Sequence, residues 1–397
     1  MKTVYLDSNA TTRVHPAVLE EMIPFYTEKW GNASSMHAVG RAAKKALERS
    51  RERVAELLDA PSPEEIIFTS GGTESNNFAI KSTAYTFLNK GNHIITSSVE
   101  HHAVLKTCEY LKKQGFTVTR LSVNRYGEID PKELRKCINK NTILITIMAA
   151  NNETGTIMPV KEIGKIASEN GVLFHTDAVQ MAGKMPFSVR ETGADMVSLS
   201  GHKLYGPKGI GALYLRKKLK SDAYHHGGSQ ERGRRAGTEN IPCIVGFGKA
   251  CELARINMRE NYEKTKRLRD LLYSRILKEV KYVTLNGHPE KRLPNTLNLS
   301  FQYLEGESII LSLDLEGICV SSGSACTSGS LEVSHVLKNM GLEAMELQGS
   351  VRFSLSIFNT EEEIESVMEK LPPVIERLRK ISPVYVEDKR EGRISGQ

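Results

Sequence analysis

Short apolar runs alternate with helical patterns between residues 66 and 215, and this alternation constrains the fold more than any other feature of the chain. The apolar runs lie at residues 66–69, 93–96, 116–121, 142–148, 172–176, 194–199 and 211–215. Each run is short enough for a buried strand, and the segments between them carry apolar residues at helical spacing. Strands that alternate with helices over this length predict a mostly parallel sheet with right-handed crossovers, and hence an α/β domain.

Two of these runs end on polar clusters that suggest a cofactor. The run at 194–199 is followed by Ser200, His202 and Lys203, and the preceding run ends at Asp177. Ligands in open α/β sheets bind at the carboxyl ends of strands, and a buried lysine there is a good imine former. Pyridoxal phosphate needs such a lysine and an acidic partner for its pyridine nitrogen. A lone lysine in this turn is equally compatible with a surface site, but the second cluster favours the cofactor.

Three further run ends carry candidate site residues. Gly72 and Thr73 open the helix after the run at 66–69, which suits a phosphate but also an ordinary capped helix. His101 starts another helix and can stack on a planar ring, although a lone histidine is more often structural. Asn152 follows the run at 142–148 and can bond either a ring hydroxyl or a substrate carboxylate.

Composition excludes several functional classes. The net charge of +7 over 397 residues is spread without a long basic run, which disfavours nucleic-acid binding. The six cysteines have no C-x-x-C spacing, so neither a zinc site nor a disulfide framework is expected. No stretch has the apolar length of a membrane helix, and the first residues are too polar for a signal peptide. We therefore expect a cytoplasmic protein.

The length predicts two domains. A long helical pattern at 242–278 can link a large α/β domain to a region of short strands and helices, which is typical of a smaller α+β domain. We assign residues 13–255 to the large domain, residues 1–12 and 256–385 to the small domain, and residues 386–397 to a flexible tail.

Two segments outside the alternating part belong to the large domain. In the first, Ser34 or Ser35 is expected to cap a helix over residues 38–58. The glycine-rich, basic segment at 225–240 lacks apolar periodicity and is predicted to be an extended loop. Long loops in compact domains are more often functional than not, and Thr238 with its neighbouring arginines suits a phosphate.

Cys326 and Arg352 stand out in the second domain. Cys326 lies among small residues that cannot pack a core, so we interpret it as an accessible nucleophile in preference to a passive loop residue. Arg352 lies in an alternating strand at 350–355 and can grip a substrate carboxylate, although a surface salt bridge is the commoner use of an arginine.

These motifs together resemble a known family. From residue 5 to about residue 385 the chain resembles the pyridoxal-phosphate-dependent cysteine desulfurases of the NifS/IscS type, most closely the NifS-like branch. The resemblance implies a fold-type I transferase, with a mostly parallel seven-stranded sheet in the large domain and a smaller α+β domain. The motifs that carry it lie at residues 9–12, 69–75, 100–101, 150–155, 175–180, 201–203, 230–240 and 322–330.

The resemblance also implies a role for each candidate around the cofactor ring. Lys203 would carry pyridoxal phosphate as a Schiff base and then act as general base and acid. Asp177 would pair with the pyridine nitrogen, Gln180 with the ring oxygen, and His101 would stack on the ring. The phosphate would be held by Gly72, Thr73, Ser200 and His202, and by Thr238 from the other subunit of a homodimer with shared sites.

The implied reaction converts L-cysteine to L-alanine. Arg352, Asn152 and Asn32 would bind the cysteine carboxylate, and Cys326 would take the sulfur as a persulfide. The sulfur then passes to an acceptor such as an iron–sulfur scaffold protein, and no resident metal is expected. Departures from the family pattern at Ser8, Ala33 and Ile357 touch no implied catalytic role, but they leave the acceptor open.

Two other interpretations compete with this one. A selenocysteine lyase or an aminotransferase could use the same fold, because fold alone does not set the chemistry. The loop around Cys326 disfavours an aminotransferase. An iron–sulfur scaffold is disfavoured because Cys326 has no neighbouring cysteine ligands, so at most it donates one ligand to a cluster shared with a partner.

Overall fold

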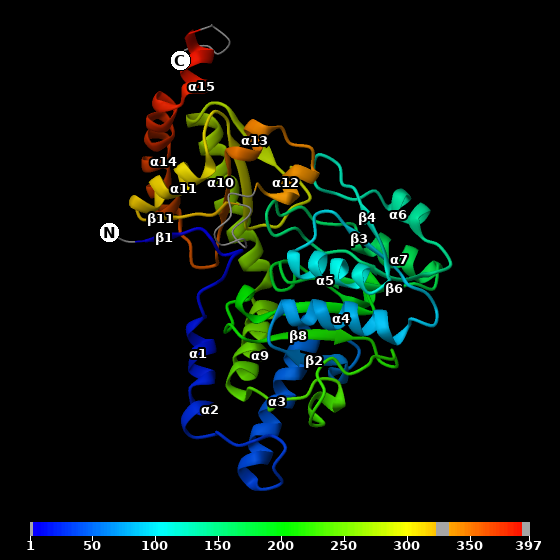
Figure 1. Ribbon diagram of the computed structural model, residues 1–397. Helices are drawn as coiled ribbons and strands as arrows, with labels where there is room; N and C mark the ends of the chain where they lie inside the picture. The colour runs from blue at the N-terminus through cyan, green and yellow to red at the C-terminus, as the bar shows by residue number, and fades with distance from the viewer. Residues whose placement is uncertain (1–2, 323–332, 391–397) are drawn as a thin grey trace.

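A seven-stranded sheet organises the larger part of the computed structural model, which describes residues 3–322 and 333–390 (Figure 1). Its spatial order is β2-β8-β7-β6-β5-β3-β4, and only β8 runs against the other six strands. The predicted mostly parallel α/β sheet is therefore confirmed. The strands are β2 (Ile66–Thr69), β3 (His93–Ser97), β4 (Thr117–Leu121), β5 (Thr142–Thr146), β6 (Leu173–Asp177), β7 (Met196–Ser200) and β8 (Gly211–Leu215).

Helices cover both faces of this sheet because successive apolar side chains of each strand point to opposite sides. Ile94 and Leu144 pack with α4 and α5, whereas Ile95 and Ile145 pack with α3, α7 and α9. The bounds of the covering helices are α3 (Ala38–Leu57), α4 (Gly72–Thr86), α5 (His102–Lys113), α7 (Val160–Glu169) and α9 (Ile241–Ile256). Shorter elements are α1 (Pro16–Met22), α2 (Pro24–Thr27), α6 (Pro131–Cys137), α8 (Val189–Thr192) and the 3-10 turns Pro63–Glu65, Gly201–Lys203 and Gln230–Gly233.

A second hydrophobic core joins the N-terminal segment to the C-terminal part of the chain. Val4 and Leu6 pack in the same cluster as Phe353, and β1 (Val4–Tyr5) pairs with β11 (Ile318–Cys319). The antiparallel sheet of this part has the order β12-β10-β9, formed by β12 (Ser350–Ser354), β10 (Thr296–Phe301) and β9 (Val283–Asn286). The helices in the C-terminal part of the chain are α10 (Met258–Glu279), α11 (Gly306–Leu315), α12 (His335–Asn339), α13 (Ala344–Gln348), α14 (Glu361–Ile381) and α15 (Pro383–Arg390).

The helical pattern at 242–278 is two helices, not one. α9 ends at Ile256, and α10 starts at Met258 after Asn257 takes a ψ of 12°, outside the helical range. The break lets α9 pack on the large sheet while α10 packs in the second core (Figure 1). The apolar pattern of residues 242–278 indicates which side of each helix is buried. It does not indicate that the first helix packs on one core and the second helix on another.

Three smaller predictions differ from the structure. Neither Ser34 nor Ser35 caps α3, because the N-cap position falls at His37, whose Nδ1 atom accepts from the backbone N–H of Gly40 at 3.3 Å. Residues 386–390 of the predicted tail are helical, as part of α15, and residues 391–397 lie outside the described part of the chain. The sequence pattern predicts no element at the positions of α1, α2 and α13, which are helical in the structure.

Among the described helices, none combines the length and apolar character that crossing a membrane requires.

Candidate active site

Side chains from both hydrophobic units converge on a cavity of about 320 Å³ at the carboxyl edge of the large sheet. Strands β2, β3, β5, β6 and β7 all end at this edge, so the segments that follow them meet there. Ten of the predicted site residues line the cavity, namely Gly72, Thr73, His101, Asn152, Asp177, Gln180, Ser200, His202, Lys203 and Arg352.

Lys203 lies in the turn that follows β7, with its ammonium group directed to the N-terminal segment. Its Nζ atom donates to the carbonyl oxygens of Asn9 and Ala10, at 2.5 and 2.6 Å. Both residues also line the cavity, although the sequence assigned them no individual role. The N-terminal segment therefore faces the amine on which the cofactor prediction depends.

Asp177 ends β6 and is held by two N–H donors. The Nδ2 atom of Asn76 donates to one carboxylate oxygen at 2.6 Å, and the backbone N–H of Val179 donates to the other at 3.0 Å. These donors fix the plane of a carboxylate that is 7% exposed at the cavity. Asn76 was not predicted, yet it lies one helical turn after Gly72 on α4, and this spacing places the two on one face.

The start of α4 forms an anion cradle. Gly71 adopts φ 152° and ψ −178°, a conformation open essentially only to glycine, and it turns the chain from β2 into the helix. A Cβ atom on Gly72 would come within 2.8 Å of the Val179 side chain, so a larger residue would close the approach. The N–H groups of the first helical turn have no intrahelical partner and can hold a phosphate.

His202 adds a neutral imidazole to this cradle. Burial, and then the charges of Lys203, Lys208 and Lys184, lower the pKa of His202 to about 4. Its Nδ1 atom lies 3.1 Å from the Thr11 hydroxyl. One ring nitrogen is thus engaged by the N-terminal segment, which leaves the other to serve an anion bound in the cavity.

His101 caps α5 on the cavity wall. Its Nδ1 atom accepts from the backbone N–H of Ala103 at 3.1 Å, and burial is the main cause that lowers its pKa. A neutral imidazole in this position suits stacking on a planar ligand.

The preceding Glu100 is fully buried, and burial raises its pKa to about 8. Its carboxyl group accepts from the Ser97 hydroxyl and from the backbone N–H of Met148. Glu100 therefore ties the end of β3 to that of β5.

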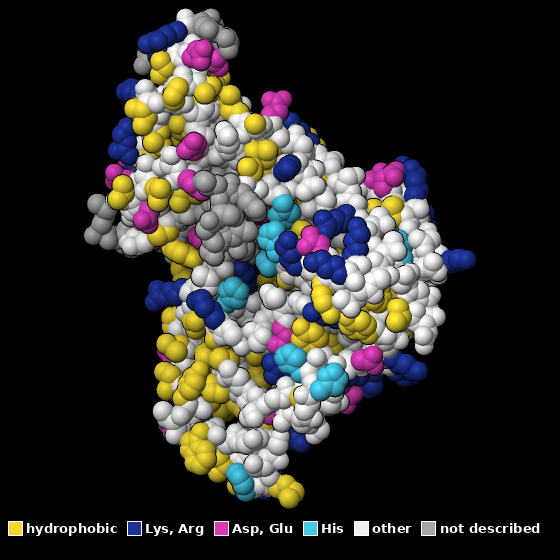
Figure 2. Space-filling view, viewed as in Figure 1, with side chains coloured by type: hydrophobic (Ala, Val, Ile, Leu, Met, Phe, Trp, Pro, Cys, Tyr) yellow, Lys and Arg dark blue, Asp and Glu magenta, His cyan; other side chains and the backbone are white. Residues whose placement is uncertain are grey.

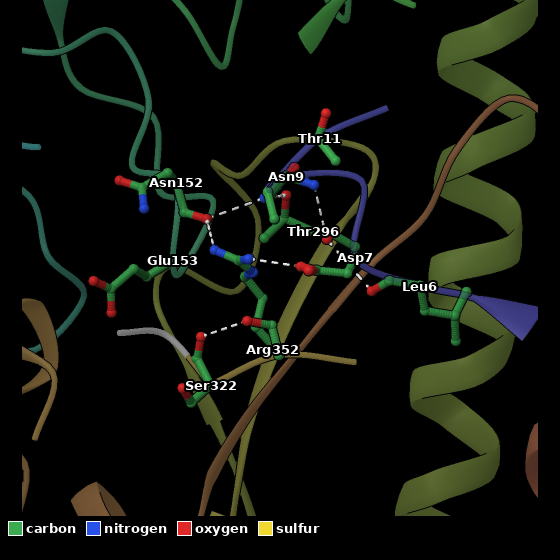
Figure 3. Close-up of polar contacts among 12 residues, drawn as sticks. Leu6, Asp7, Asn9, Thr11, Asn152, Glu153, Thr296, Ser322 and Arg352 are labelled. Carbon is green, nitrogen blue, oxygen red and sulfur yellow. Dashed lines mark hydrogen bonds and ion pairs between the residues drawn. The ribbon is translucent and has the colours of Figure 1, made fainter. Parts of the chain in front are cut away.

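Arg352 brings a buried positive charge to the cavity from β12. Figure 3 shows its guanidinium group between Asp7 and the Asn152 carbonyl, at 2.8 and 3.1 Å respectively. The sequence left open whether this arginine grips a substrate or forms a surface salt bridge. Its ion pair with Asp7 is not on the surface, because the Arg352 side chain is 3% exposed. The pair orients the guanidinium at the place where a carboxylate could meet it.

Three predicted site residues are not brought to this cavity. Asn32 lies in the exposed turn before α3, where its side chain accepts from Ser34, and Thr238 is exposed in the loop before α9. Neither lines the cavity of its own chain. Cys326 lies outside the described residues.

The cavity joins a lysine and an aspartate at the carboxyl edge of an α/β sheet, the two groups that enzymes dependent on pyridoxal phosphate require. The chain belongs to the aminotransferase class-V family, whose model matches residues 4–367. Members of this family are in general dependent on pyridoxal phosphate.

Individual relatives narrow the likeness further. The chain is 52% identical to the cysteine desulfurase IscS of Methanosarcina thermophila over 389 residues, which covers 98% of this chain and 96% of the relative. A solved NifS-like protein superposes with a TM-score of 0.90 at 42% identity, over 95% of this chain and all of that one. A structure of SspA in complex with cysteine has a TM-score of 0.79 at 37% identity, over 90% of this chain and all of that one. The predicted family resemblance is confirmed.

Proposed function

We propose that this chain is a cysteine desulfurase that uses pyridoxal phosphate to convert L-cysteine to L-alanine and passes the sulfur on. The observation that carries the proposal is one cavity that joins Lys203, Asp177 and Arg352, and so pairs an imine-forming amine with a ring partner and a carboxylate clamp. The names of the relatives support the same activity.

The cavity residues fit the cofactor group by group. The helix start at Gly72 suits the phosphate, and Asp177 suits the pyridine nitrogen. Bound there, pyridoxal phosphate would supply an electron sink next to the amino group of the substrate. Lys203 would bind the cofactor covalently and move the proton at the substrate α-carbon, and His101 would cover one face of the ring.

In the proposed reaction, a thiol of the chain accepts the sulfur atom of the substrate. Arg352 would hold the substrate carboxylate, with Asn152 beside it. The carbon–sulfur bond of the substrate breaks with its electron pair kept by carbon, and the sulfur bonds to the Cys326 thiolate as a persulfide. We assign the released sulfur to a thiol acceptor, such as an iron–sulfur scaffold protein. A cytoplasmic setting keeps such thiols reduced, and the described cysteines are all free.

A homodimer would complete the site. Large apolar side chains are exposed on and after α1 and α2, and Figure 2 shows yellow side chains gathered at the lower left of the molecule, where these helices lie. Apolar patches of this kind mark interaction surfaces. Thr238 is exposed in the loop before α9, and the family resemblance implies that it would reach the phosphate of the partner in such a dimer. The exposed residues are Leu19, Ile23, Tyr26, Trp30 and Met36, at 51%, 50%, 58%, 70% and 90% exposure.

The cysteine assay tests the proposal directly. Protein purified with pyridoxal phosphate should be yellow and, with L-cysteine and dithiothreitol, should form alanine and sulfide in equal amounts. Dithiothreitol supplies the two electrons that release the persulfide sulfur as sulfide. Protein that takes up no cofactor would overturn the proposal, as would transfer of the cysteine amino group to a 2-oxo acid without sulfide. Faster turnover of selenocysteine than of cysteine would favour a selenocysteine lyase.

Arg352→Lys should lower kcat/KM for cysteine about 10- to 100-fold, mainly through KM. Lysine keeps the positive charge that Asp7 needs, but it cannot present two parallel N–H donors to a carboxylate. Cofactor binding should be unchanged. Arg125→Lys is the matched control, because that arginine is 60% exposed in its pair with Glu346. An unchanged KM in the Arg352 variant would remove the carboxylate clamp from the proposal.

A further inference from the structure

A second lysine, Lys184, is buried behind the cavity, where two neutral side chains accept its hydrogen bonds. It is 9% exposed, and its Nζ atom donates to the side-chain oxygens of Gln180 at 2.8 Å and Asn9 at 3.0 Å. Within residues 3–322 and 333–390 no carboxylate forms an ion pair with it. Burial of an ammonium group against neutral oxygens is costly, and a methionine of similar length would avoid the cost. Stability of the fold therefore does not explain this lysine.

The contacts of Gln180 and Asn9 fix which side-chain atom each turns to Lys184. The Nε2 atom of Gln180 donates to the backbone oxygen of Asn9 at 3.0 Å, and the Nδ2 atom of Asn9 donates to that of Asn152 at 3.1 Å. A backbone carbonyl only accepts, so the amide nitrogens belong there and the amide oxygens face Lys184. The amide nitrogen of Gln180 consequently has a second N–H group, which can donate to a ligand in the cavity that Gln180 lines.

Lys184 also acts on the cavity through its charge. Burial lowers its pKa well below the ordinary value, and the charges of Lys203 and Arg352 lower it further. The Coulomb interaction between two ammonium groups is mutual, so in its protonated form Lys184 favours the uncharged amine at Lys203. Arg352 is itself paired with Asp7. The other titratable side chains that line the two cavities beside these amines are His101, His202, Asp177, His15, Tyr205, Glu260 and Lys264.

We propose that Lys184 is a positioning residue of the cofactor site. Through Gln180 and Asn9 it holds an N–H donor toward the ring oxygen of pyridoxal phosphate and keeps the nitrogen of Lys203 unprotonated. The inference rests on the proposed function and extends it to a residue that contacts neither the reacting atoms nor the substrate. A lysine that only fastened the N-terminal segment to the loop after β6 would affect stability, but not the proton equilibrium of the bound cofactor.

A matched control lies in a second cavity of about 290 Å³, which both Lys184 and Lys264 line. The Nζ atom of Lys264 donates to the Ile357 carbonyl at 2.6 Å, and within the described part of the chain this lysine forms no hydrogen bond with Gln180 or Asn9. Replacement of Lys264 by methionine therefore removes a lysine from the same cavity and leaves the Lys184 contacts intact.

The test is a pH titration of the visible absorption band in the cofactor-loaded enzyme. In Lys184→Met the midpoint should rise by about one pH unit, because a nearby positive charge and a hydrogen-bond donor to the ring oxygen are both weakened. The dissociation constant of pyridoxal phosphate from the apoprotein should rise about tenfold. Lys264→Met should change neither quantity.

Lys184→Gln separates the two effects, since it keeps an N–H donor and removes the charge. It should recover most of the cofactor affinity but not the wild-type midpoint, and it carries the test if the methionine variant does not fold. A folded Lys184→Met enzyme with wild-type midpoint and affinity would overturn the inference, as would an equal shift in Lys264→Met. Wild-type protein without a visible band would instead overturn the proposed function.

Discussion

Lys203→Ala should lack the absorption band of the cofactor imine and should lose at least about 10³-fold in kcat for desulfuration. The substitution removes the amine that would bond the cofactor and the base that would move the α-proton, so two functions are lost together. Lys184 cannot replace it, because Gln180 and Asn9 hold its Nζ atom behind the cavity. Absorption spectra after reconstitution and sulfide release under saturating cysteine measure the two losses separately.

Lys208→Ala is the matched control for this experiment. Lys208 lies five residues further along the same turn but is exposed and does not line the cavity. Its variant should bind the cofactor and turn over cysteine as the wild type does. A Lys203→Ala enzyme that kept the imine band and produced sulfide near the wild-type rate would show that another amine carries the cofactor.

Much of the site was predictable because parallel strands end at a common edge. Asp177 and Lys203 each follow an apolar run, and the crossover rule places such ends together without knowledge of the order of the strands. Local composition also predicted the helix start near Gly72, although it left open whether that start holds a phosphate or is an ordinary capped helix.

The N-terminal half of the site was not predictable in the same way. Asp7 pairs with Arg352 across 345 positions of the chain, and Asn9 meets Lys203 across 194. Such contacts follow from the packing of Val4 and Leu6 in the second core, and no periodicity in the sequence reports where that core docks on the large sheet. Without the family resemblance, residues 5–12 suggest only a short strand that runs into a polar turn, and no individual role follows from that pattern.

Buried polar groups were missed for a related reason. Lys184, Glu100 and Asn76 look like ordinary helix or loop residues in the sequence, where lysine and glutamate usually face solvent. Their burial follows from the neighbours that close around them, such as the backbone N–H of Met148 on Glu100. Asn76 alone carried a local indication, through its one-turn spacing from Gly72.

Cys326→Ser should keep the yellow colour and lose at least about 10³-fold in sulfide release from cysteine. The hydroxyl group is hardly ionised near neutral pH, so it cannot attack sulfur, whereas the cavity residues that hold the cofactor are unchanged. The wild-type protein, quenched during turnover without reductant, should gain the mass of one sulfur atom on the peptide that contains Cys326. The serine variant should show no such gain.

Cys319→Ser separates this effect from the general loss of a thiol. Cys319 lies in β11, seven positions earlier, and burial is the main cause that raises its pKa, with Asp314 and Asp7 adding to the rise. A thiol with a raised pKa is a poor nucleophile at neutral pH, so this variant should release sulfide at the wild-type rate. If the Cys326 variant retained full activity while the Cys319 variant lost it, the sulfur would be taken up by the strand cysteine. The colour of both variants would still report an intact cofactor site, which keeps the assignment of the nucleophile independent of the assignment of Lys203.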